Sequence, residues 1–182
     1  MKLIKHCCAL ALLASMVGPA LTLAPQALAA TPVVQAADAG RVVDRASFER
    51  YLGMFNRKDP AAFETYYAPE VRMSNGGLVF EGIPAVKEHY RKIWGAMDEK
   101  VIVEEFLFDG KTLAVQLHAI FNVPRDAQDT PFGPIRQGER FDYRGAVVYK
   151  LNEAGKFTDI KVAYYGFSRT TDGVTRAMGM PH

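Results

Sequence analysis

His89 and Tyr51 are the two residues whose types and positions best suit proton transfer. His89 falls at the edge of an apolar stripe in the stretch 82–97, where apolar residues recur at helical spacing. In a pocket it could act as a general base near neutral pH, whereas on the helix flank it would be half-exposed and structural. Tyr51 lies on the apolar stripe of an earlier helix, where its phenol could contact a ligand or bond to a core neighbour. Both alternatives stay open for both residues.

Four other polar side chains are weaker candidates. His118 lies on the strand face opposite to the apolar Leu117 row, so we expect it to point outward, toward a second subunit. Glu104 alternates with apolar residues; buried, it would have a raised pKa and could act as an acid, while a surface position is the simpler reading. Asp142 and Arg144 alternate with aromatic residues and are expected to face solvent or a partner subunit.

No metal or cofactor is expected. Outside the N-terminal leader the histidines are His89, His118 and His182, and they lack the H-x-H or H-x-x-x-H spacing of metal sites. The run 75–77, Asn-Gly-Gly, is a turn without the Lys-Ser/Thr of a phosphate loop. No G-x-S-x-G motif occurs, and no cysteine follows Cys8.

Three predicted helices position the candidate residues. The spacing of Phe48, Tyr51 and Phe55 predicts the first helix. Asp59 suits an N-cap and Pro60 a first helical position, so a short second helix follows. The third helix starts after Gly82 and carries a wide apolar face to residue 97.

Strands account for most of the remaining chain. A short strand, 71–74, precedes the third helix, and alternating patterns predict strands at 101–108, 113–123, 139–151 and 157–167. The intervening segment 124–137 contains three prolines and predicts a long loop, which could be a lid, an interface arm or a plain connector. Helices followed by hairpin-linked strands predict an α+β fold, in which a strongly curved antiparallel sheet packs around three N-terminal helices.

The N-terminus reads as a secretory signal peptide. Lys2 and Lys5 precede an apolar run, and residues 27–29, Ala-Leu-Ala, offer a cleavage site. We therefore expect residues 1–30 to be a signal peptide rather than a membrane anchor, and the protein to be periplasmic. We expect 31–44 to be a spacer, 45–168 one domain and 169–182 a mobile tail.

Charge argues against nucleic acid as a partner. The formal net charge of +2 comes from the two lysines of the leader, so the rest of the chain is neutral and has no basic block. The cysteines, Cys7 and Cys8, also lie in the leader, so the exported chain must rely on its core rather than on disulfides.

The pattern of residues 44–167 resembles the NTF2-like superfamily, which includes SnoaL-like polyketide cyclases and ketosteroid isomerases. The resemblance rests on the run from Tyr51 through Asn56 and Asp59 to Val71 and Gly82, and on the closing turn and strand at 152–164. It implies a cone-shaped α+β fold, and this fold hosts both enzymes and non-enzymes.

Comparison with the ketosteroid isomerases tests one activity. Tyr51 matches their oxyanion-hole tyrosine, but the position of their general-base aspartate is Asn75 and that of their protonated aspartate is Val147. Asn75 cannot abstract a proton at neutral pH and Val147 donates nothing. The resemblance therefore implies a related pocket without steroid isomerisation by that mechanism.

Three functions stay open. The first is an exported domain that binds a small apolar molecule in the cone. The second is a SnoaL-like isomerase, cyclase or dehydratase that uses Tyr51 and His89, and the third is a structural or partner-binding module, dimeric through the outer sheet face. The expected ligand-contacting residues come from the third helix and the inward strand rows: Asn75, Trp94, Leu117, Tyr143, Val147, Tyr149, Val162 and Tyr164.

Overall fold

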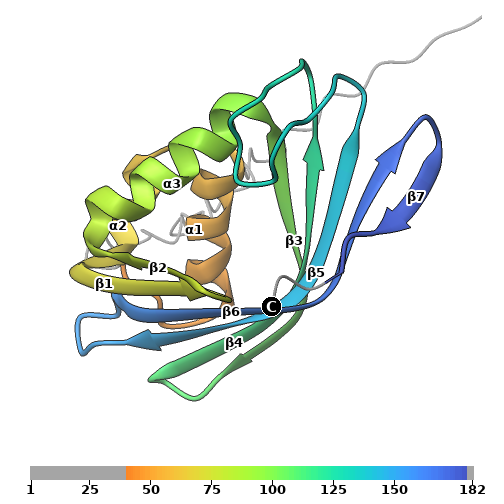
Figure 1. The fold of residues 1–182 in the computed structure, drawn as a ribbon. Coiled ribbons are helices and arrows are strands. Elements are labelled where there is room, and N and C mark those ends of the chain that lie inside the picture. The colour runs from red at the N-terminus through yellow and green to blue at the C-terminus, as the bar shows by residue number, and fades with distance from the viewer. Residues whose placement is uncertain (1–39, 180–182) are drawn as a thin grey trace, which may run out of the picture. The chain divides into compact units, whose positions relative to one another are not determined.

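The computed structural model describes residues 40–179, so the expected signal peptide and most of the expected spacer lie outside the described residues. The helices in this part are α1 (Arg45–Asn56), α2 (Ala61–Tyr66) and α3 (Gly82–Ala96). The strands are β1 (Tyr67–Asn75), β2 (Leu78–Glu81), β3 (Asp98–Phe108), β4 (Thr112–Asn122), β5 (Arg140–Leu151), β6 (Phe157–Thr171) and β7 (Val174–Ala177). The helices lie on the concave side of the curved sheet (Figure 1).

Helix α1 begins with a capping box. The Asp44 carboxylate accepts from the Ser47 backbone N–H at 2.7 Å, and the Ser47 hydroxyl oxygen accepts from the Asp44 N–H at 3.0 Å. This satisfies two amides that have no partner within the helix. The predicted apolar stripe of Phe48, Tyr51 and Phe55 is buried, and it holds the helix against the sheet.

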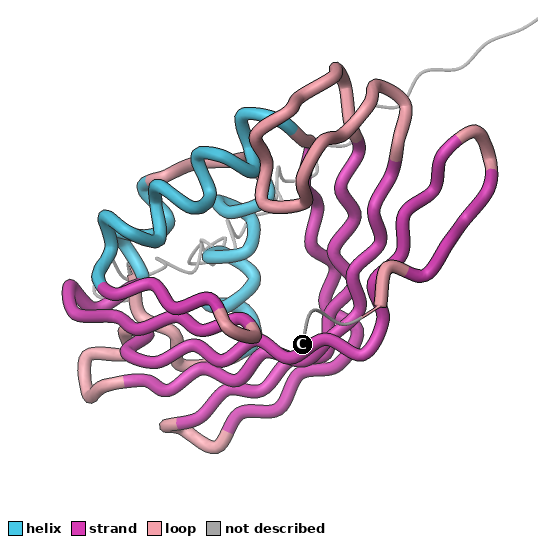
Figure 2. The backbone as a smooth tube through the Cα atoms, viewed as in Figure 1, coloured by secondary structure: helices cyan, strands magenta, loops and turns pink. Residues whose placement is uncertain are grey.

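The sheet is mixed, and this corrects the expectation of a wholly antiparallel one. Its strand order is β2-β1-β6-β5-β4-β3, with β7 beside β6. The pairs within β3–β6 are antiparallel, but β1 lies parallel to β6, with Met73 opposite Ile160 and Asn75 opposite Val162. A parallel pair needs a long connection, and here that connection contains α3 and the four strands β2, β3, β4 and β5. These strands form one seven-stranded sheet, which appears as a curved layer in Figure 2.

Two segments differ from the sequence-based expectation. Residues 78–81, for which the sequence predicts no element, form β2 and pair with β1. Residues 169–177, expected as part of a mobile tail, complete β6 and form β7, with Arg169 opposite Arg176. Asp172 and Gly173 have positive φ values at the tip, which closes this hairpin tightly.

A β-bulge in β3 places Glu104 on the outer face of the sheet, in agreement with the simpler of its two sequence-based readings. The register shifts between Val103 and Glu105, so Val103 and Phe106 both face the helices while Glu104 lies outside. There a hydrogen bond from Gln116 and an ion pair with Arg144 hold the pKa of the Glu104 carboxylate below its usual value. It is therefore not an acid on the inner surface.

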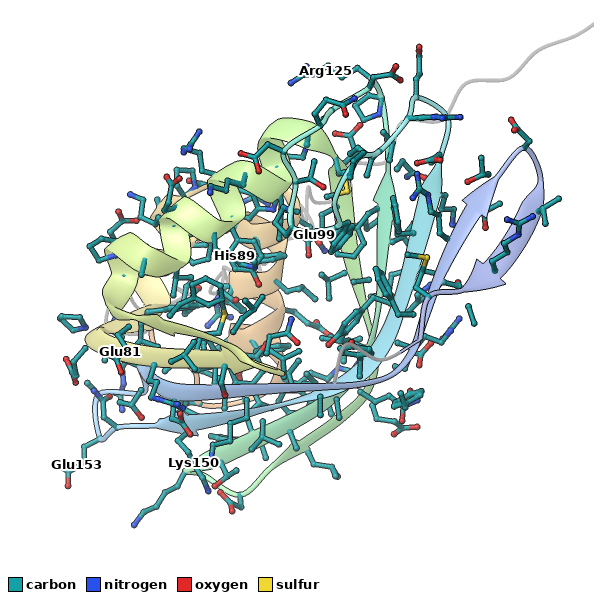
Figure 3. The ribbon with its side chains drawn as sticks, viewed as in Figure 1. Glu81, His89, Glu99, Arg125, Lys150 and Glu153 are labelled. Atoms are coloured by element: carbon teal, nitrogen blue, oxygen red, sulfur yellow. The ribbon has the colours of Figure 1, made fainter. Side chains whose placement is uncertain are left out.

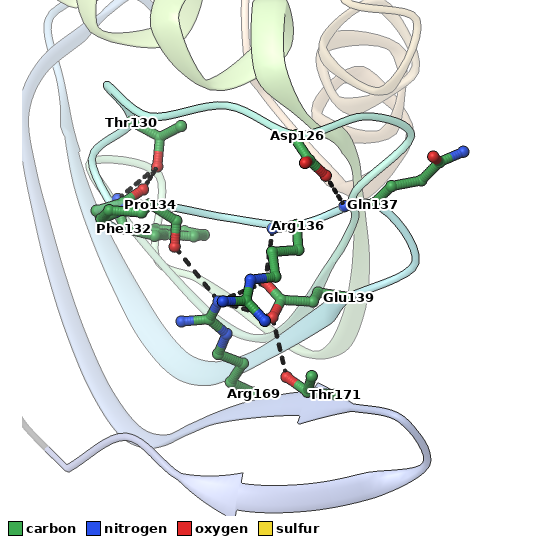
Figure 4. Close-up of polar contacts among 10 residues, drawn as sticks. Asp126, Thr130, Phe132, Pro134, Arg136, Gln137, Glu139, Arg169 and Thr171 are labelled. Carbon is green, nitrogen blue, oxygen red and sulfur yellow. Dashed lines mark hydrogen bonds and ion pairs between the residues drawn. The ribbon is translucent and has the colours of Figure 1, made fainter.

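The loop 124–137 is fastened to the sheet by a buried carboxylate (Figure 4). Glu139, only 3% exposed, accepts hydrogen bonds from Arg169 at 2.5 and 2.7 Å, from the Thr171 hydroxyl at 3.0 Å and from the Arg136 backbone N–H at 2.9 Å. Phe132 at the loop tip packs on aromatic rings of β4, β5 and β6. The loop is thus tied at its base and its tip.

Candidate functional site

Two phenols meet at the centre of the core. The hydroxyl oxygens of Tyr51 on α1 and Tyr67 on β1 lie 2.8 Å apart, and both side chains are buried. Burial raises the pKa of both phenols, so both stay neutral and act only as hydrogen-bonding groups. Tyr51, the predicted oxyanion-type donor, therefore already has a hydrogen-bond partner.

More phenols surround this pair. Burial raises the pKa of Tyr90 on α3 and of Tyr149 on β5. The second cause is Glu99 for Tyr90 and Tyr67 for Tyr149. The Tyr90 ring lies 4.9 Å from that of Phe55 and 5.3 Å from those of Phe63 and Trp94. Tyr90 thus packs among aromatic rings of all three helices, and the phenols in this region stay uncharged.

Glu99 is a buried acid in the same region, and it is not among the candidate residues that the sequence indicates. Its side chain on β3 is 8% exposed and accepts a hydrogen bond from Nε1 of Trp94 at 2.9 Å. Burial raises its pKa to about 8, although the Trp94 bond and the Lys58 charge act in the opposite direction. The Lys58 ammonium is bonded elsewhere, to an Asp98 carboxylate oxygen at 2.5 Å and to the Met97 carbonyl at 3.1 Å.

The strand pattern holds the signal that would have identified Glu99. The sequence predicts that this strand starts at residue 101, but β3 already begins at Asp98. Glu99 is therefore on the same face as Val101 and Val103, which point toward the helices. Extending the alternation two residues toward the N-terminus places a carboxylate on the inner row.

His89 lies at the edge of the inner surface. Its imidazole packs against the Phe80 ring at a centroid distance of 4.3 Å and against Tyr90 at 5.2 Å. Burial, and then the charge of Lys92, lower its pKa, so the ring is neutral near pH 7 and could accept a proton. Figure 3 shows His89 and Glu99 on the side of α3 that faces the sheet, whereas Lys150 and Glu153 point away.

The predicted ligand-contacting residues follow the inner strand rows. Leu117, Val147 and Tyr149 are buried, while the partly exposed members are Asn75, Trp94, Tyr143, Val162 and Tyr164. Val147 pairs with Val162 on β6, which in turn pairs with Asn75 on β1, so these three form one row. The structure therefore brings together the sheet members of the predicted set, while Trp94 lies across from them on α3.

Tyr143 and Tyr164 form an unusual pair. Their rings lie 4.9 Å apart, and neither buried hydroxyl has a hydrogen-bond partner among the described residues. Burial raises the pKa of both phenols. Gly145 makes the arrangement possible, because a Cβ there would lie 2.9 Å from the Tyr164 Cα and 3.0 Å from the Tyr143 ring.

The outer sheet face carries a polar network instead. His118 lies there and bonds through Nε2 to the Asp142 carboxylate at 2.7 Å, while Gln116 donates to Glu104 at 3.1 Å. Arg140 completes the network by pairing with Asp142 at 2.6 Å. These side chains hold one another in place and do not approach Tyr51 or His89.

A groove of about 940 Å³ lies between α2 and α3, and Phe63 and Trp94 are among its lining residues. Its three cations are paired with neighbouring acids: Lys58 with Asp98 at 2.5 Å, Lys87 with Glu64, and Arg91 with Glu88 at 2.7 Å. No group of three metal-binding side chains occurs among residues 40–179. Within that range, too, no helix has the length and apolar character needed to span a membrane.

Comparisons with known proteins agree with this architecture. The family model described as the SnoaL-like domain matches residues 48–160. Similar solved structures include a Delta 5-3-ketosteroid isomerase from Mycobacterium sp., with 15% identity and a TM-score of 0.55, covering 69% of this chain and 96% of that chain. The epoxide hydrolase/cyclase-like enzyme SalBIII has 21% identity and a TM-score of 0.53, covering 65% and 87%. A computationally designed 17-OHP binder has 17% identity and a TM-score of 0.53, covering 65% and 89%. No match was found among curated proteins.

Proposed function

Because this chain belongs to the SnoaL-like domain family, we propose that it binds a small, largely apolar molecule between α3 and the inner face of its sheet. The observation that carries the proposal is the Tyr143–Tyr164 pair, whose buried hydroxyls lack partners among the described residues. Unpartnered buried donors are costly, and a ligand oxygen would satisfy them. Around them, partly exposed apolar side chains such as Val103, Val162 and Phe167 supply the contact surface.

Native mass spectrometry of protein purified from the exported fraction tests this proposal. We expect a bound species that is displaced by organic solvent and depleted in the Tyr143→Phe, Tyr164→Phe double variant. Tyr165→Phe is the matched control, because Tyr165 lies next to Tyr164 but is 59% exposed. Wild-type protein that carries no ligand and takes up no apolar dye would refute small-molecule binding.

Catalysis is the second candidate, and the position of His89 favours it. A neutral imidazole on the partly exposed inner surface could remove a proton from a bound molecule, as an isomerase, cyclase or dehydratase requires. Tyr51 would then act through its bond to Tyr67, because its hydroxyl is already engaged. His89→Gln, which keeps the hydrogen bonding but not the basicity, should abolish turnover of the co-purified molecule while leaving its binding intact.

Export and dimer formation are further parts of the proposal. The leader 1–30 supports periplasmic localisation, and N-terminal sequencing of exported protein should begin near Ala30 or Thr31.

The outer sheet face, where Ile102 is 42% exposed beside the His118 network, supports a homodimer. Ile102→Arg should lower the mass measured by analytical ultracentrifugation to that of one chain, whereas Leu78→Arg, on exposed β2, should not.

A further inference from the structure

Two buried glutamates in this domain have opposite surroundings. Glu139 is held by Arg169, the Thr171 hydroxyl and a backbone N–H, so its carboxylate is compensated. Glu99 is 8% exposed and has no ion pair within residues 40–179. An unpaired buried carboxylate is so unfavourable that the group keeps its proton instead. Glu99 is therefore a neutral carboxylic acid under conditions in which Glu139 is ionised.

The groups around Glu99 reinforce this state. Tyr67 on β1 and Tyr90 on α3 face it with neutral phenols, and the charge of Glu99 would raise the pKa of each. The nearest cation is Lys58 in the turn between α1 and α2, and its ammonium is bonded to Asp98. Apart from the hydrogen bond from the Trp94 indole N–H, no described residue replaces the hydration that a Glu99 carboxylate would lose.

A neutral carboxyl group has one O–H to donate. The Trp94 indole N–H donates a hydrogen bond to Oε2 of Glu99, so this oxygen already acts as an acceptor. The acidic proton has no acceptor among the hydrogen bonds of the described residues. Glu99 lies opposite Phe121 on β4, and the Phe132 ring of the loop packs 5.0 Å from that of Phe121, so the surroundings are aromatic. An aromatic wall beside one free O–H suits an apolar molecule with an acceptor oxygen.

We propose that Glu99 donates the hydrogen bond that fixes a carbonyl oxygen of a neutral, apolar ligand, so that binding weakens when this carboxyl ionises. The inference rests on the proposed binding function and narrows it to a ligand class, ketones and related carbonyl compounds. It also assigns Trp94 a positioning role, because its indole holds the carboxyl in one orientation. Tyr143 and Tyr164 would contact a different part of the same molecule.

Two neutral dyes separate the hydrogen bond from Glu99 from binding by apolar contact alone. Prodan carries a ketone, whereas N-phenylnaphthylamine is apolar without a carbonyl. With a Glu99 pKa of about 8, the wild-type affinity for Prodan should fall about tenfold from pH 7 to pH 9, because only the protonated fraction donates. The affinity for N-phenylnaphthylamine should stay constant. Glu99→Gln should bind Prodan without this pH dependence, since an amide still donates, and Glu139→Gln should keep the wild-type profile.

The outcomes are distinguishable. A Prodan affinity that is flat between pH 7 and 9 in the wild type, or that falls equally in Glu99→Gln, overturns the role of Glu99 but leaves apolar binding standing. Failure of both dyes to bind the folded wild type at any pH overturns the binding function, and the role of Glu99 with it. Infrared difference spectra provide an independent check: a protonated-carboxyl band should disappear between pH 6 and 10 in the wild type and be absent from Glu99→Gln.

Discussion

The hydroxyl oxygens of Tyr51 and Tyr67 lie 2.8 Å apart, joining α1 to the start of β1 inside an aromatic core. The Tyr51 ring also packs on Phe157 of β6 at a centroid distance of 5.2 Å. This one bond therefore links a helix and a strand that are separated by a second helix. Each phenol satisfies the other, and this allows two hydroxyls to be buried without water.

Removing both partners of this bond should cost less stability than the two single removals added together. Tyr51→Phe leaves the buried Tyr67 hydroxyl unpaired, at a cost of about 1–3 kcal/mol in the free energy of unfolding. The double variant should lose less than the sum of the two single variants, because no orphan hydroxyl remains. Urea denaturation of the four proteins measures this coupling. Tyr149→Phe, a buried tyrosine without a hydrogen bond among the described residues, is the control, and additive losses would contradict the assignment.

Glu99 should make the protein less stable as the pH rises. Its folded pKa of about 8 exceeds the unfolded value of about 4.3, so between these values the native state binds more protons than the unfolded state. Stability should then decrease with increasing pH, by up to about 1.4 kcal/mol per unit. Urea midpoints should be measured from pH 5 to 8 for Glu99→Gln and the wild type. The two midpoints should be similar at low pH, and that of the variant should be higher at high pH. Glu105→Gln, at an exposed position of the same strand, should follow the wild type.

Glu139 should have the opposite pH dependence. Burial raises its pKa, but hydrogen bonds from the Arg136 N–H, Arg169 and Thr171 outweigh burial, so the folded pKa is lowered. The stability from Glu139 is then complete above the unfolded value of about 4.3 and is lost as the pH falls through the folded value. Arg169→Leu should cost about 2 kcal/mol at pH 7, because the carboxylate stays buried without its cation. Denaturation at pH 7 and pH 3 should show this difference shrinking in acid; an equal loss at both values would exclude the ion pair as the cause.

Local sequence patterns predicted the local parts of the fold. The stripe of Phe48, Tyr51 and Phe55 identified α1, and strict alternation identified the inner row of β4, because both periods depend only on near neighbours. The same reasoning missed the parallel pairing of β1 with β6, since partners such as Met73 and Ile160 are far apart in sequence. It also left both an inner and a surface position open for Glu104, because one extra residue in β3 reverses the alternation there.

The candidate site was harder to predict because its chemistry depends on tertiary burial. Glu99 looks like part of a charged turn, and only the Trp94 indole and the packed phenols make it a neutral acid. Tyr143 and Tyr164 were expected to face inward, but the sequence does not reveal that their hydroxyls lack partners among the described residues. The sequence thus predicted which residues share a face. Whether a buried polar group has a hydrogen-bond partner follows only from the three-dimensional structure.

The row formed by Val147, Val162 and Asn75 leads to the last prediction: Val147→Asp alone will not create ketosteroid isomerase activity. Val147 and Asn75 are two strand spacings apart, about 10 Å, so new carboxyls at both positions would flank one bound molecule. A carboxyl at position 147 alone restores an oxyanion donor worth about 3 kcal/mol of barrier, but Asn75 still cannot move a proton. The missing general base costs on the order of a hundred- to ten-thousand-fold in rate.

Assays of the single and double variants on an unsaturated ketosteroid provide the test. Because Val147 is buried, its replacement by Asp should also lower the melting temperature, so thermal melts must confirm that each variant is folded. Activity should appear only in the Asn75→Asp, Val147→Asp double variant. Turnover by Val147→Asp alone would mean that the base lies elsewhere. His89, neutral near pH 7 and partly exposed against Phe80, would then be the residue to replace next.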